Sequence, residues 1–308
     1  MELEEFVFES GDGYKLPAYI WKPEGETKSV LQITHGMTEH MGRYESLAKR
    51  LSEKGIALAG FDLRGHGKNP GDSKCASFGQ GGWDKSLGDM HCFYELLNRR
   101  FGDVPHTMLG FSLGSFLLRD YLNIYGDKLY GAIIMGSGEQ PALILRLLKK
   151  LIFGQCKKYG FDNSSEIVKM LSFEAYNGKF KNTKTGSDWL CSDEKELGEY
   201  IGDPLCKEEI SAGLFFQMLN SMERCSSKRA YENWNKELPV LLLSGSCDPV
   251  GDMGKGVLKL KKNMEKAGLS AVAFKIINGA RHDLIHEIQS GAADEAVSAI
   301  EDFILREA

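Results

Sequence analysis

The chain has 308 residues, of which 42% are hydrophobic and 26% are charged, so its composition is that of a globular protein that buries a sizeable core. The length suits one large domain with an insertion. The formal net charge is −5 at pH 7 and the chain has no basic arm or long Lys/Arg tract, which argues against nucleic acid as the main partner.

The predicted elements begin with a hairpin, because residues 3–9 and 16–22 alternate between apolar and polar side chains around a turn at 11–13. Further along, short apolar runs predict buried strands over 30–34, 56–61, 107–111, 129–135, 240–244 and 271–277. Runs with helical spacing predict helices over 43–54, 84–101, 113–125, 254–267 and 290–306. Strands that are apolar along their whole length and alternate with helices are typical of a parallel sheet covered by helices on both faces.

The alternation breaks between residues 139 and 236, where several helical segments follow one another without a convincing strand. We therefore predict a core of residues 1–138 and 237–308, interrupted by a helical insertion over 139–236.

Nothing at the N-terminus predicts export, because its first residues are acidic and lack the basic start and apolar core of a secretory signal. No window holds about 18 consecutive apolar residues, so we expect no transmembrane helix. The seven cysteines are scattered without a C-x-x-C pair, which predicts reduced thiols and a cytoplasmic location. Cys206 and Cys247 are interpreted as small buried hydrophobic side chains. No metal or organic cofactor is expected, because neither metal-ligand spacing nor a dinucleotide-binding glycine motif is present.

A glycine-flanked serine lies between a predicted strand and a predicted helix, in Gly110-Phe111-Ser112-Leu113-Gly114, which fits G-x-S-x-G. This setting is that of a nucleophile elbow, in which a strained turn lifts the serine hydroxyl clear of the sheet. A side chain at either glycine would collide with neighbouring backbone. The hydroxyl would lie at a helix N-terminus, which favours developing negative charge. Ser112 is therefore the predicted nucleophile.

A serine hydroxyl is a poor nucleophile until a base takes its proton, and in this arrangement the acid and the histidine follow the serine in chain order. Asp248 and His282 each follow a later predicted strand. We assign His282 as general base and then general acid, and Asp248 as the group that orients the imidazole and stabilises its charged form. The rivals are Asp252 and His286, which lie later in the same loops, where we expect a helix to have begun.

The tetrahedral intermediate of an acyl transfer needs backbone N–H donors aimed at its oxygen. One donor should come from Leu113, the residue after the nucleophile. The other should come from the loop after the third predicted strand, where Gly36 permits a sharp turn, so we assign the N–H of Met37. His35 and His40, in the same loop, are interpreted as side chains that hold the loop by hydrogen bonds.

Five features follow one another along the chain: H-G-M-T-E-H at 35–40, D-L-R-G-H-G at 62–67, G-F-S-L-G at 110–114, Asp248 and His282. Together they resemble the monoacylglycerol lipase and lysophospholipase group of α/β hydrolases, also described as serine aminopeptidase S33. The resemblance implies a mostly parallel eight-stranded sheet with helices on both faces and a helical cap between the sixth and seventh strands. It also implies an ester hydrolase in which Met37 and Leu113 form the oxyanion hole and the segment 62–67 is structural.

The insertion carries bulky apolar side chains, including Leu214, Phe215, Phe216, Met218 and Leu219. An apolar roof over a serine nucleophile favours an acyl chain, so we expect a small hydrophobic ester such as a monoacylglycerol or a lysophospholipid. Two alternatives stay open: an aminopeptidase or amidase on the same triad, and a catalytically silent binding protein on the same fold.

Residues 142–153 form a strongly apolar helix that carries Arg146, Lys149 and Lys150. One interpretation is a cap helix that packs its apolar face over the active site and leaves its basic face in solvent. The other is a basic amphipathic helix that makes transient contact with a membrane surface. The oligomeric state is left open.

Overall fold

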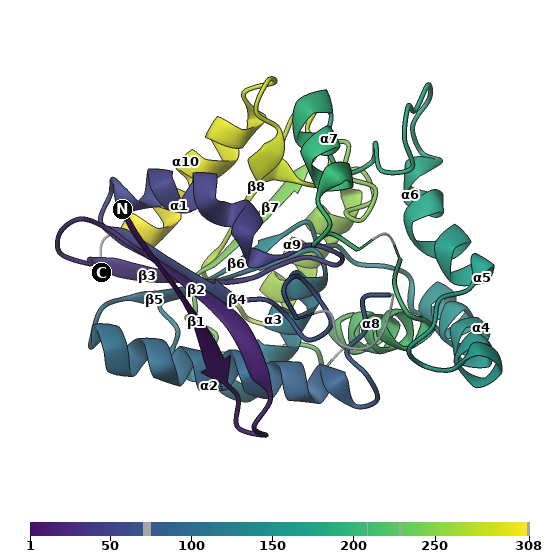
Figure 1. Cartoon of the computed structure of the whole chain (residues 1–308), viewed down its shortest axis with the longest axis horizontal. Helices are drawn as coiled ribbons and strands as arrows, with labels where there is room; N and C mark the ends of the chain where they lie inside the picture. The colour runs from purple at the N-terminus through teal and green to yellow at the C-terminus, as the bar shows by residue number, and fades with distance from the viewer. Residues whose placement is uncertain (70–74, 208, 228, 307–308) are drawn as a thin grey trace.

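Eight strands form a single sheet in the computed structural model, which describes residues 1–69, 75–207, 209–227 and 229–306 (Figure 1). The strands are β1 (Glu2–Glu9), β2 (Lys15–Lys22), β3 (Ser29–Thr34), β4 (Ile56–Phe61), β5 (His106–Phe111), β6 (Gly131–Met135), β7 (Val240–Gly245) and β8 (Val272–Ile277). Their order across the sheet is β1-β2-β4-β3-β5-β6-β7-β8. The β1–β2 and β2–β4 pairs are antiparallel and the other pairs are parallel. The predicted sheet is therefore confirmed.

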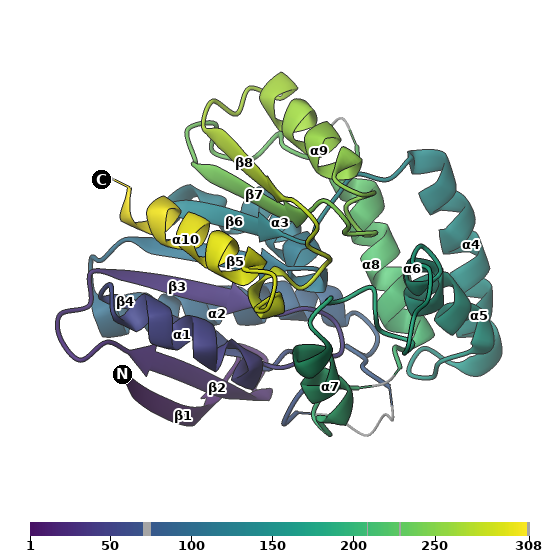
Figure 2. The same cartoon turned by 90° about the horizontal axis from the view of Figure 1, so that it is seen from above.

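Strand residues alternate between two hydrophobic cores, because successive side chains of a strand point to opposite faces. In β7, for example, Val240 and Leu242 join one core while Leu241 and Leu243 join the other. The first core is covered by α2 (Gly82–Phe101), α3 (Leu113–Tyr125) and α9 (Lys255–Lys266), and the second by α1 (Glu45–Ser52) and α10 (Ala292–Leu305) (Figure 2). Because both faces are covered, strands β3 to β7 are buried at every position.

The predicted helix over 43–54 begins with a different local structure. Met41–Tyr44 form a 3₁₀ turn, which α1 follows directly. His40 caps this turn, because its Nδ1 accepts a hydrogen bond from the N–H of Gly42 at 3.1 Å. The start of a helix is usually recognised in a sequence by Ser, Thr, Asp or Asn at the cap position. A histidine cap gives no such signal, so the sequence does not show where this helix begins. At the other end Gly55 takes a φ of 80°, which lets the chain leave the helix.

Between β6 and β7 the described residues form helices and no strand. The helices are α4 (Ala142–Tyr159), α5 (Glu166–Lys169), a π-helical turn (Met170–Glu174), α6 (Ala175–Asn177), α7 (Glu194–Gly202) and α8 (Ala212–Cys225). They gather at one side of the sheet in both views (Figure 1 and Figure 2). Residues 208 and 228 of the predicted insertion lie outside the described residues.

Polar contacts, one partly exposed and the others buried, fix α8 to the core, and α4 packs in turn on α8. Arg224 of α8 pairs with Asp120 of α3 at 2.5 Å. Arg119, also on α3, donates to the carbonyl oxygen of Cys225 at 2.9 Å and to Glu139 at 3.1 Å. Arg119 and Glu139 are fully buried, and breaking a buried pair by removing one partner costs about 3–5 kcal/mol, so the contacts of Arg119 make α8 the fixed helix of the insertion.

Helix α4 has two apolar faces, only one of which is covered. Leu145 and Ile152 are buried, whereas Leu143 is 70% exposed and Leu147 is 60% exposed. An exposed stripe of this kind is unusual on a helix that packs on a core, because the apolar face normally points inward. Within the described ranges, no helix is long and apolar enough to cross a membrane.

Candidate active site

Ser112 lies at the junction of β5 and α3 with a φ of 51° and a ψ of −115°, a conformation that side-chain-bearing residues rarely adopt. The two flanking glycines permit this turn. A Cβ on Gly114 would collide with the carbonyl oxygen of Thr34, and a Cβ on Gly110 would collide with the carbonyl of Gly114. The N–H of Ser112 donates to the carbonyl oxygen of Met135 at 2.9 Å, which ties the turn to β6. The structure therefore contains the strained strand–helix turn that the motif predicts.

His282 and Asp248 are brought together from the loops after β8 and β7. The Nδ1 of His282 lies 2.9 Å from Asp248 Oδ1, and both side chains are buried. The same oxygen accepts the N–H of Val250 at 2.8 Å, which fixes the carboxylate. A carboxylate only accepts, so Nδ1 carries the proton and Nε2 carries a lone pair. This Nε2 is buried and has no hydrogen-bond partner among the described residues.

Ser112 and His282 line one pocket with two kinds of wall. The apolar wall is made mainly of aromatic side chains: Phe111, Phe116, Phe173, Tyr176, Trp189 and Met218. The polar wall is made of side chains that contact one another: Thr38, Glu39, Arg43, Tyr200 and Asp283. The site therefore offers an apolar surface and a hydrogen-bonding surface to one ligand.

The roof of this pocket differs from the predicted one. No residue of α4 lines the pocket, so the interpretation of that helix as packing over the active site is wrong. Of the five bulky residues predicted for the roof, Met218 lines the pocket. Phe216 packs instead on Phe153 of α4, at 5.3 Å between ring centroids. The aromatic residues of the π-helical turn, of α6 and of the segment after it take this place, and no periodic pattern in the sequence marks them.

The assignment of Leu113 and Met37 as oxyanion donors stays a prediction, which the positions of the two residues support. Leu113 is the first residue of α3, and the first N–H groups of a helix have no partner inside it. Met37 lines the pocket. Its loop is held by Glu39, whose Oε1 accepts the N–H of Gly36 at 2.5 Å and the hydroxyl of Tyr44 at 2.9 Å. Glu39 is thus a supporting residue of this loop to which the sequence pattern assigned no role.

His35 and His40 hold the loop by hydrogen bonds, as predicted. The Nδ1 of His35 lies 2.7 Å from the carbonyl oxygen of Gly36, and its Nε2 accepts the N–H of Leu63 at 2.9 Å. Burial lowers the pKa of His35 well below its usual value, which keeps the ring neutral. Asp62 is also structural, because its two oxygens accept the backbone N–H groups of Met41 and Lys68, each at 2.9 Å.

Asp252 and His286, the alternatives to Asp248 and His282, lie outside the histidine–aspartate pair. Asp252 has a φ of 49° and precedes α9, so the expectation that a helix has begun there is wrong. His286 does lie in a short 3₁₀ helix, Leu284–His286, as expected. Among the described residues, His282 lines the pocket with Ser112 and pairs with Asp248, whereas Asp252 and His286 do not line it.

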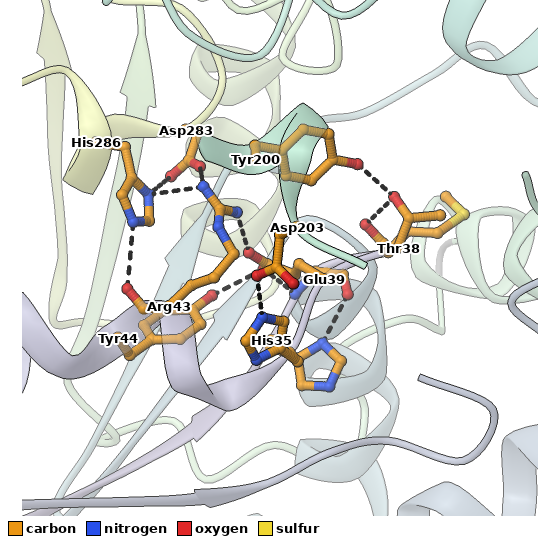
Figure 3. A network of polar contacts seen from close by, with 12 residues as sticks. His35, Thr38, Glu39, Arg43, Tyr44, Tyr200, Asp203, Asp283 and His286 are labelled. Atoms are coloured by element: carbon orange, nitrogen blue, oxygen red, sulfur yellow. Dashed lines mark hydrogen bonds and ion pairs between the residues drawn. The ribbon is translucent and has the colours of Figure 1, made fainter. Parts of the chain in front are cut away.

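A buried charge network lies beside the pocket, centred on Arg43 (Figure 3). Its Nη1 is 2.6 Å from Glu39 Oε2, and its Nη2 is 2.9 Å from Asp283 Oδ2. Both nitrogens of His286 have an acceptor nearby, with Nδ1 2.8 Å from Asp283 Oδ1 and Nε2 3.2 Å from the carbonyl oxygen of Arg43, although Nδ1 also lies 3.3 Å from Arg43 Nη2. A doubly protonated ring fits this arrangement, since it donates from both nitrogens. Two cations and two carboxylates then balance each other.

The charges in this network shift the pKa values of their partners. Burial and the charge of Arg43 act to lower the pKa of His286, but the charge and hydrogen bond of Asp283, together with the charge of Glu39, raise that pKa above its usual value. Burial acts to raise the pKa of Asp283, but His286 and Arg43 outweigh it and hold that pKa well below its usual range. The raised pKa favours the charged form of His286, which braces the network, in contrast to a free base.

Replacing His286 with glutamine is expected to destabilise the protein more in acid than in alkali. The folded pKa of His286 lies above its unfolded value of about 6.5, so the stabilisation is full below that value and is lost as the pH rises through the folded pKa. The melting-temperature difference between wild type and His286→Gln should be largest near about pH 5 and shrink toward about pH 9. Thermal unfolding across this range measures it. A difference that is constant with pH would contradict the assignment.

One group of side chains in the described part of the chain has the composition of a metal site: His40, Asp203 and Cys206. The Nδ1 of His40 accepts the N–H of Gly42, so its Nε2 carries the proton and donates to Asp203 at 2.7 Å. A metal ligand needs that nitrogen deprotonated. Cys206 is only half-buried, contrary to prediction, and burial raises the pKa of its thiol. Cys247 is half-buried as well. The cluster fits a hydrogen-bonded contact between the insertion and the core better than a metal site.

Solved structures share this fold over the whole chain. A thermostable carboxyl esterase from Bacillus coagulans, in complex with glycerol, matches with a TM-score of 0.87 and 24% identity over 99% of this chain and 100% of that one. A soluble variant of monoglyceride lipase from Saccharomyces cerevisiae, in complex with a substrate analog, matches with a TM-score of 0.75 and 18% identity over 99% of this chain and 95% of that one. The α/β-hydrolase fold is thereby established.

Sequence comparison identifies the family. The monoglyceride lipase of Mus musculus is 28% identical over 286 residues, which cover 91% of this chain and 83% of that protein. The model of the family described as serine aminopeptidase, S33, matches residues 25–289. That match spans most of the chain and includes the elbow, the histidine–aspartate pair and the helical insertion. The chain therefore belongs to the serine aminopeptidase S33 family of α/β hydrolases.

Proposed function

We propose that this chain hydrolyses carboxylic esters through an acyl-enzyme on Ser112. One observation carries the proposal: Nδ1 of His282 contacts Asp248, its buried Nε2 has no hydrogen-bond partner among the described residues, and its ring lines the same pocket as Ser112. A buried nitrogen without a partner is costly, and proton transfer from a serine hydroxyl gives this one a function. The ester-hydrolase relatives support the same chemistry.

In the proposed reaction, Ser112 Oγ attacks the ester carbonyl carbon while His282 Nε2 takes the hydroxyl proton. His282 then gives this proton to the leaving alcohol, and the acyl group remains on Ser112. Water attacks the acyl-enzyme with His282 again as base, which releases the acid and restores the serine. Asp248 orients the imidazole and stabilises its charged form, and the N–H groups of Met37 and Leu113 stabilise the oxyanion.

The pocket suits an ester with a hydrophobic acyl chain and a small polar alcohol. Its aromatic wall fits an acyl chain, and the hydroxyls of Thr38 and Tyr200 offer hydrogen bonds to the alcohol. The carboxylates of Glu39 and Asp283 are both paired with Arg43, so they are not free to bind the amine of a peptide substrate. Monoacylglycerol is therefore the favoured substrate and lysophospholipid the second candidate, ahead of an aminopeptidase substrate.

A substrate panel tests the proposal: p-nitrophenyl esters, glycerol esters and amino-acid amides, with a fluorophosphonate probe on the same samples. We expect ester hydrolysis that is faster for medium acyl chains than for acetate, and covalent labelling of the wild type. Hydrolysis of the amides without the esters would favour the aminopeptidase. A folded wild type that takes no label would favour the silent binding protein.

We propose that the insertion over 139–236 is a cap on a core of residues 1–138 and 237–308, and that α4 contacts a membrane surface transiently. Exposed large apolar side chains of α4 include Leu143, Ile144, Leu147 and Leu151. Exposed lysines on the same helix are Lys150, Lys157 and Lys158. An exposed apolar stripe with basic residues is typical of a helix that lies in the interface of an anionic bilayer.

Replacing Leu147 with aspartate is expected to weaken binding to vesicles of phosphatidylglycerol and phosphatidylcholine by about tenfold or more. The change removes an apolar contact with the bilayer and adds a charge that anionic lipid repels. Co-sedimentation measures the binding. Leu258→Asp is the matched control, because Leu258 is 47% exposed on α9, a helix of the core outside residues 139–236. Equal vesicle binding by wild type and Leu147→Asp would contradict the contact.

We also propose a cytoplasmic location. No disulfide joins any of the seven cysteines, all of which belong to the described part of the chain. Reduced thiols are the rule in the cytosol.

A further inference from the structure

One segment of the insertion, residues 188–193, runs along the loop that carries His282; we call it the strap. The residues on both sides of His282 are bonded to it. The N–H of Asp283 donates to the carbonyl oxygen of Leu190 at 2.7 Å. The guanidinium of Arg281 donates to the carbonyl oxygen of Cys191 at 3.2 Å and also to that of Asp188. The backbone around the histidine is thus held by the insertion as well as by the core.

Further contacts extend this attachment past the histidine. The fully buried carboxylate of Glu287 accepts the N–H of Ser192 at 3.0 Å and its hydroxyl, and also the N–H of Arg281 at 2.9 Å. Asp193 accepts the N–H and the side-chain amide of Gln289 at 3.1 and 3.0 Å. Since each buried polar group left without a partner costs about 1–3 kcal/mol, an array of this size keeps the strap and the histidine loop together.

The strap also contacts the ring of His282 itself. The ring lies between Phe111, at 4.9 Å between centroids, and Trp189 of the strap, at 5.0 Å. Trp189 is in turn packed against Phe173 and Tyr176. The imidazole therefore has an aromatic neighbour from the core and an aromatic neighbour from the insertion, and Asp248 holds its Nδ1.

We propose that the strap positions the imidazole of His282 against Ser112, with Arg281 and Trp189 as the positioning residues. Both act through His282: Arg281 fixes its backbone, and Trp189 limits the tilt of its ring. This inference rests on the proposed function, because it matters only if His282 is the general base. A reacting group displaced by about 1 Å costs about 10²-fold in rate, so loss of either contact should lower kcat.

Arg281→Met tests the backbone contact, because Arg281 does not line the pocket. The expected result is a kcat about tenfold lower for p-nitrophenyl butyrate, with KM within about twofold and slower fluorophosphonate labelling of Ser112. Arg281→Lys keeps a cation that donates to the strap carbonyls and should recover most of kcat. Arg306→Met is the matched control, since Arg306 also donates to two backbone carbonyls and stacks on an aromatic ring, far from the pocket.

Trp189→Leu tests the ring contact, with Trp234→Leu as its control. Both tryptophans are buried, and both indole N–H groups lack a hydrogen-bond partner among the described residues. Both changes should lower the melting temperature. Only Trp189→Leu should lower kcat per labelled active site, by about 10-fold to 100-fold, for both short and long esters. A change confined to KM would assign Trp189 to substrate binding and overturn its positioning role.

Measurements on the wild type and on the variants together separate this inference from the proposed function. A wild type that neither hydrolyses esters nor takes the label would refute the proposed function itself. An active wild type with unchanged kcat in Arg281→Met would overturn the role of Arg281, whatever the change in stability. If Arg281→Met does not fold, Trp189→Leu decides whether the strap positions His282: a lowered kcat per labelled active site supports positioning by the strap, and an unchanged kcat refutes it.

Discussion

Ester hydrolysis is expected to fall by about 10⁴-fold to 10⁶-fold when Ser112 is replaced with alanine. The change removes the only atom that forms the acyl bond, while the pocket, the histidine–aspartate pair and the oxyanion donors remain. Substrate binding should therefore be nearly unchanged. Initial rates with p-nitrophenyl butyrate measure the loss, and the fluorophosphonate label should disappear with it. A variant that keeps more than about a hundredth of the wild-type rate would show that another nucleophile carries the reaction.

Ser112→Gly serves as a control that separates chemistry from folding. Ser112 holds a φ of 51° and a ψ of −115°, and strain of this kind costs about 1–3 kcal/mol in a residue with a side chain. Glycine relieves that strain, although its freedom in the unfolded chain offsets about 1 kcal/mol. Both variants should be inactive, and Ser112→Gly should melt at a temperature no lower than Ser112→Ala.

The strands could be predicted because their cause is local. Each central strand is buried on both faces, so its residues are apolar without interruption and stand out against flanking polar turns. The start of α1 was misplaced because its cap is the imidazole of His40, which has no place in the usual capping pattern. The error in the predicted helix start is confined to the first turn, whose structure depends on the hydrogen bond to the imidazole of His40.

In the candidate site, too, some features could be predicted from the sequence and others could not. Ser112, Asp248 and His282 follow strand ends in chain order, so the predicted strands and the G-x-S-x-G motif together predicted their placement at one edge of the sheet. The charge network was not found, because Arg43 and Asp283 are far apart in sequence and no local pattern joins them. The sequence left two interpretations of α4 open for a different reason: an apolar stripe shows that a helix packs on an apolar surface, and does not show which one.

Replacing Asp248 with asparagine is the second change with a large expected effect, about 10³-fold to 10⁴-fold in kcat. Oδ1 of Asp248 accepts both the N–H of Val250 and Nδ1–H of His282, so an asparagine oxygen in this place could keep both contacts. The imidazole would then keep its orientation and its Nε2 lone pair. The negative charge would be lost, and with it the stabilisation of the imidazolium that forms as Ser112 is deprotonated.

Asp248→Asn therefore separates catalysis from folding, because the rate of this variant should fall while its fold persists. Asp248→Asn should unfold within a few degrees of the wild type, whereas kcat for p-nitrophenyl butyrate should drop sharply at nearly constant KM. Asp252→Asn is the matched control from the same loop and should retain wild-type turnover, since Asp252 lies outside the pocket. A wild-type rate in Asp248→Asn together with a loss in Asp252→Asn would transfer the acid role to Asp252. A small loss in both variants would mean that His282 needs no carboxylate partner. That outcome is not expected, because a buried imidazolium without a nearby negative charge is unfavourable.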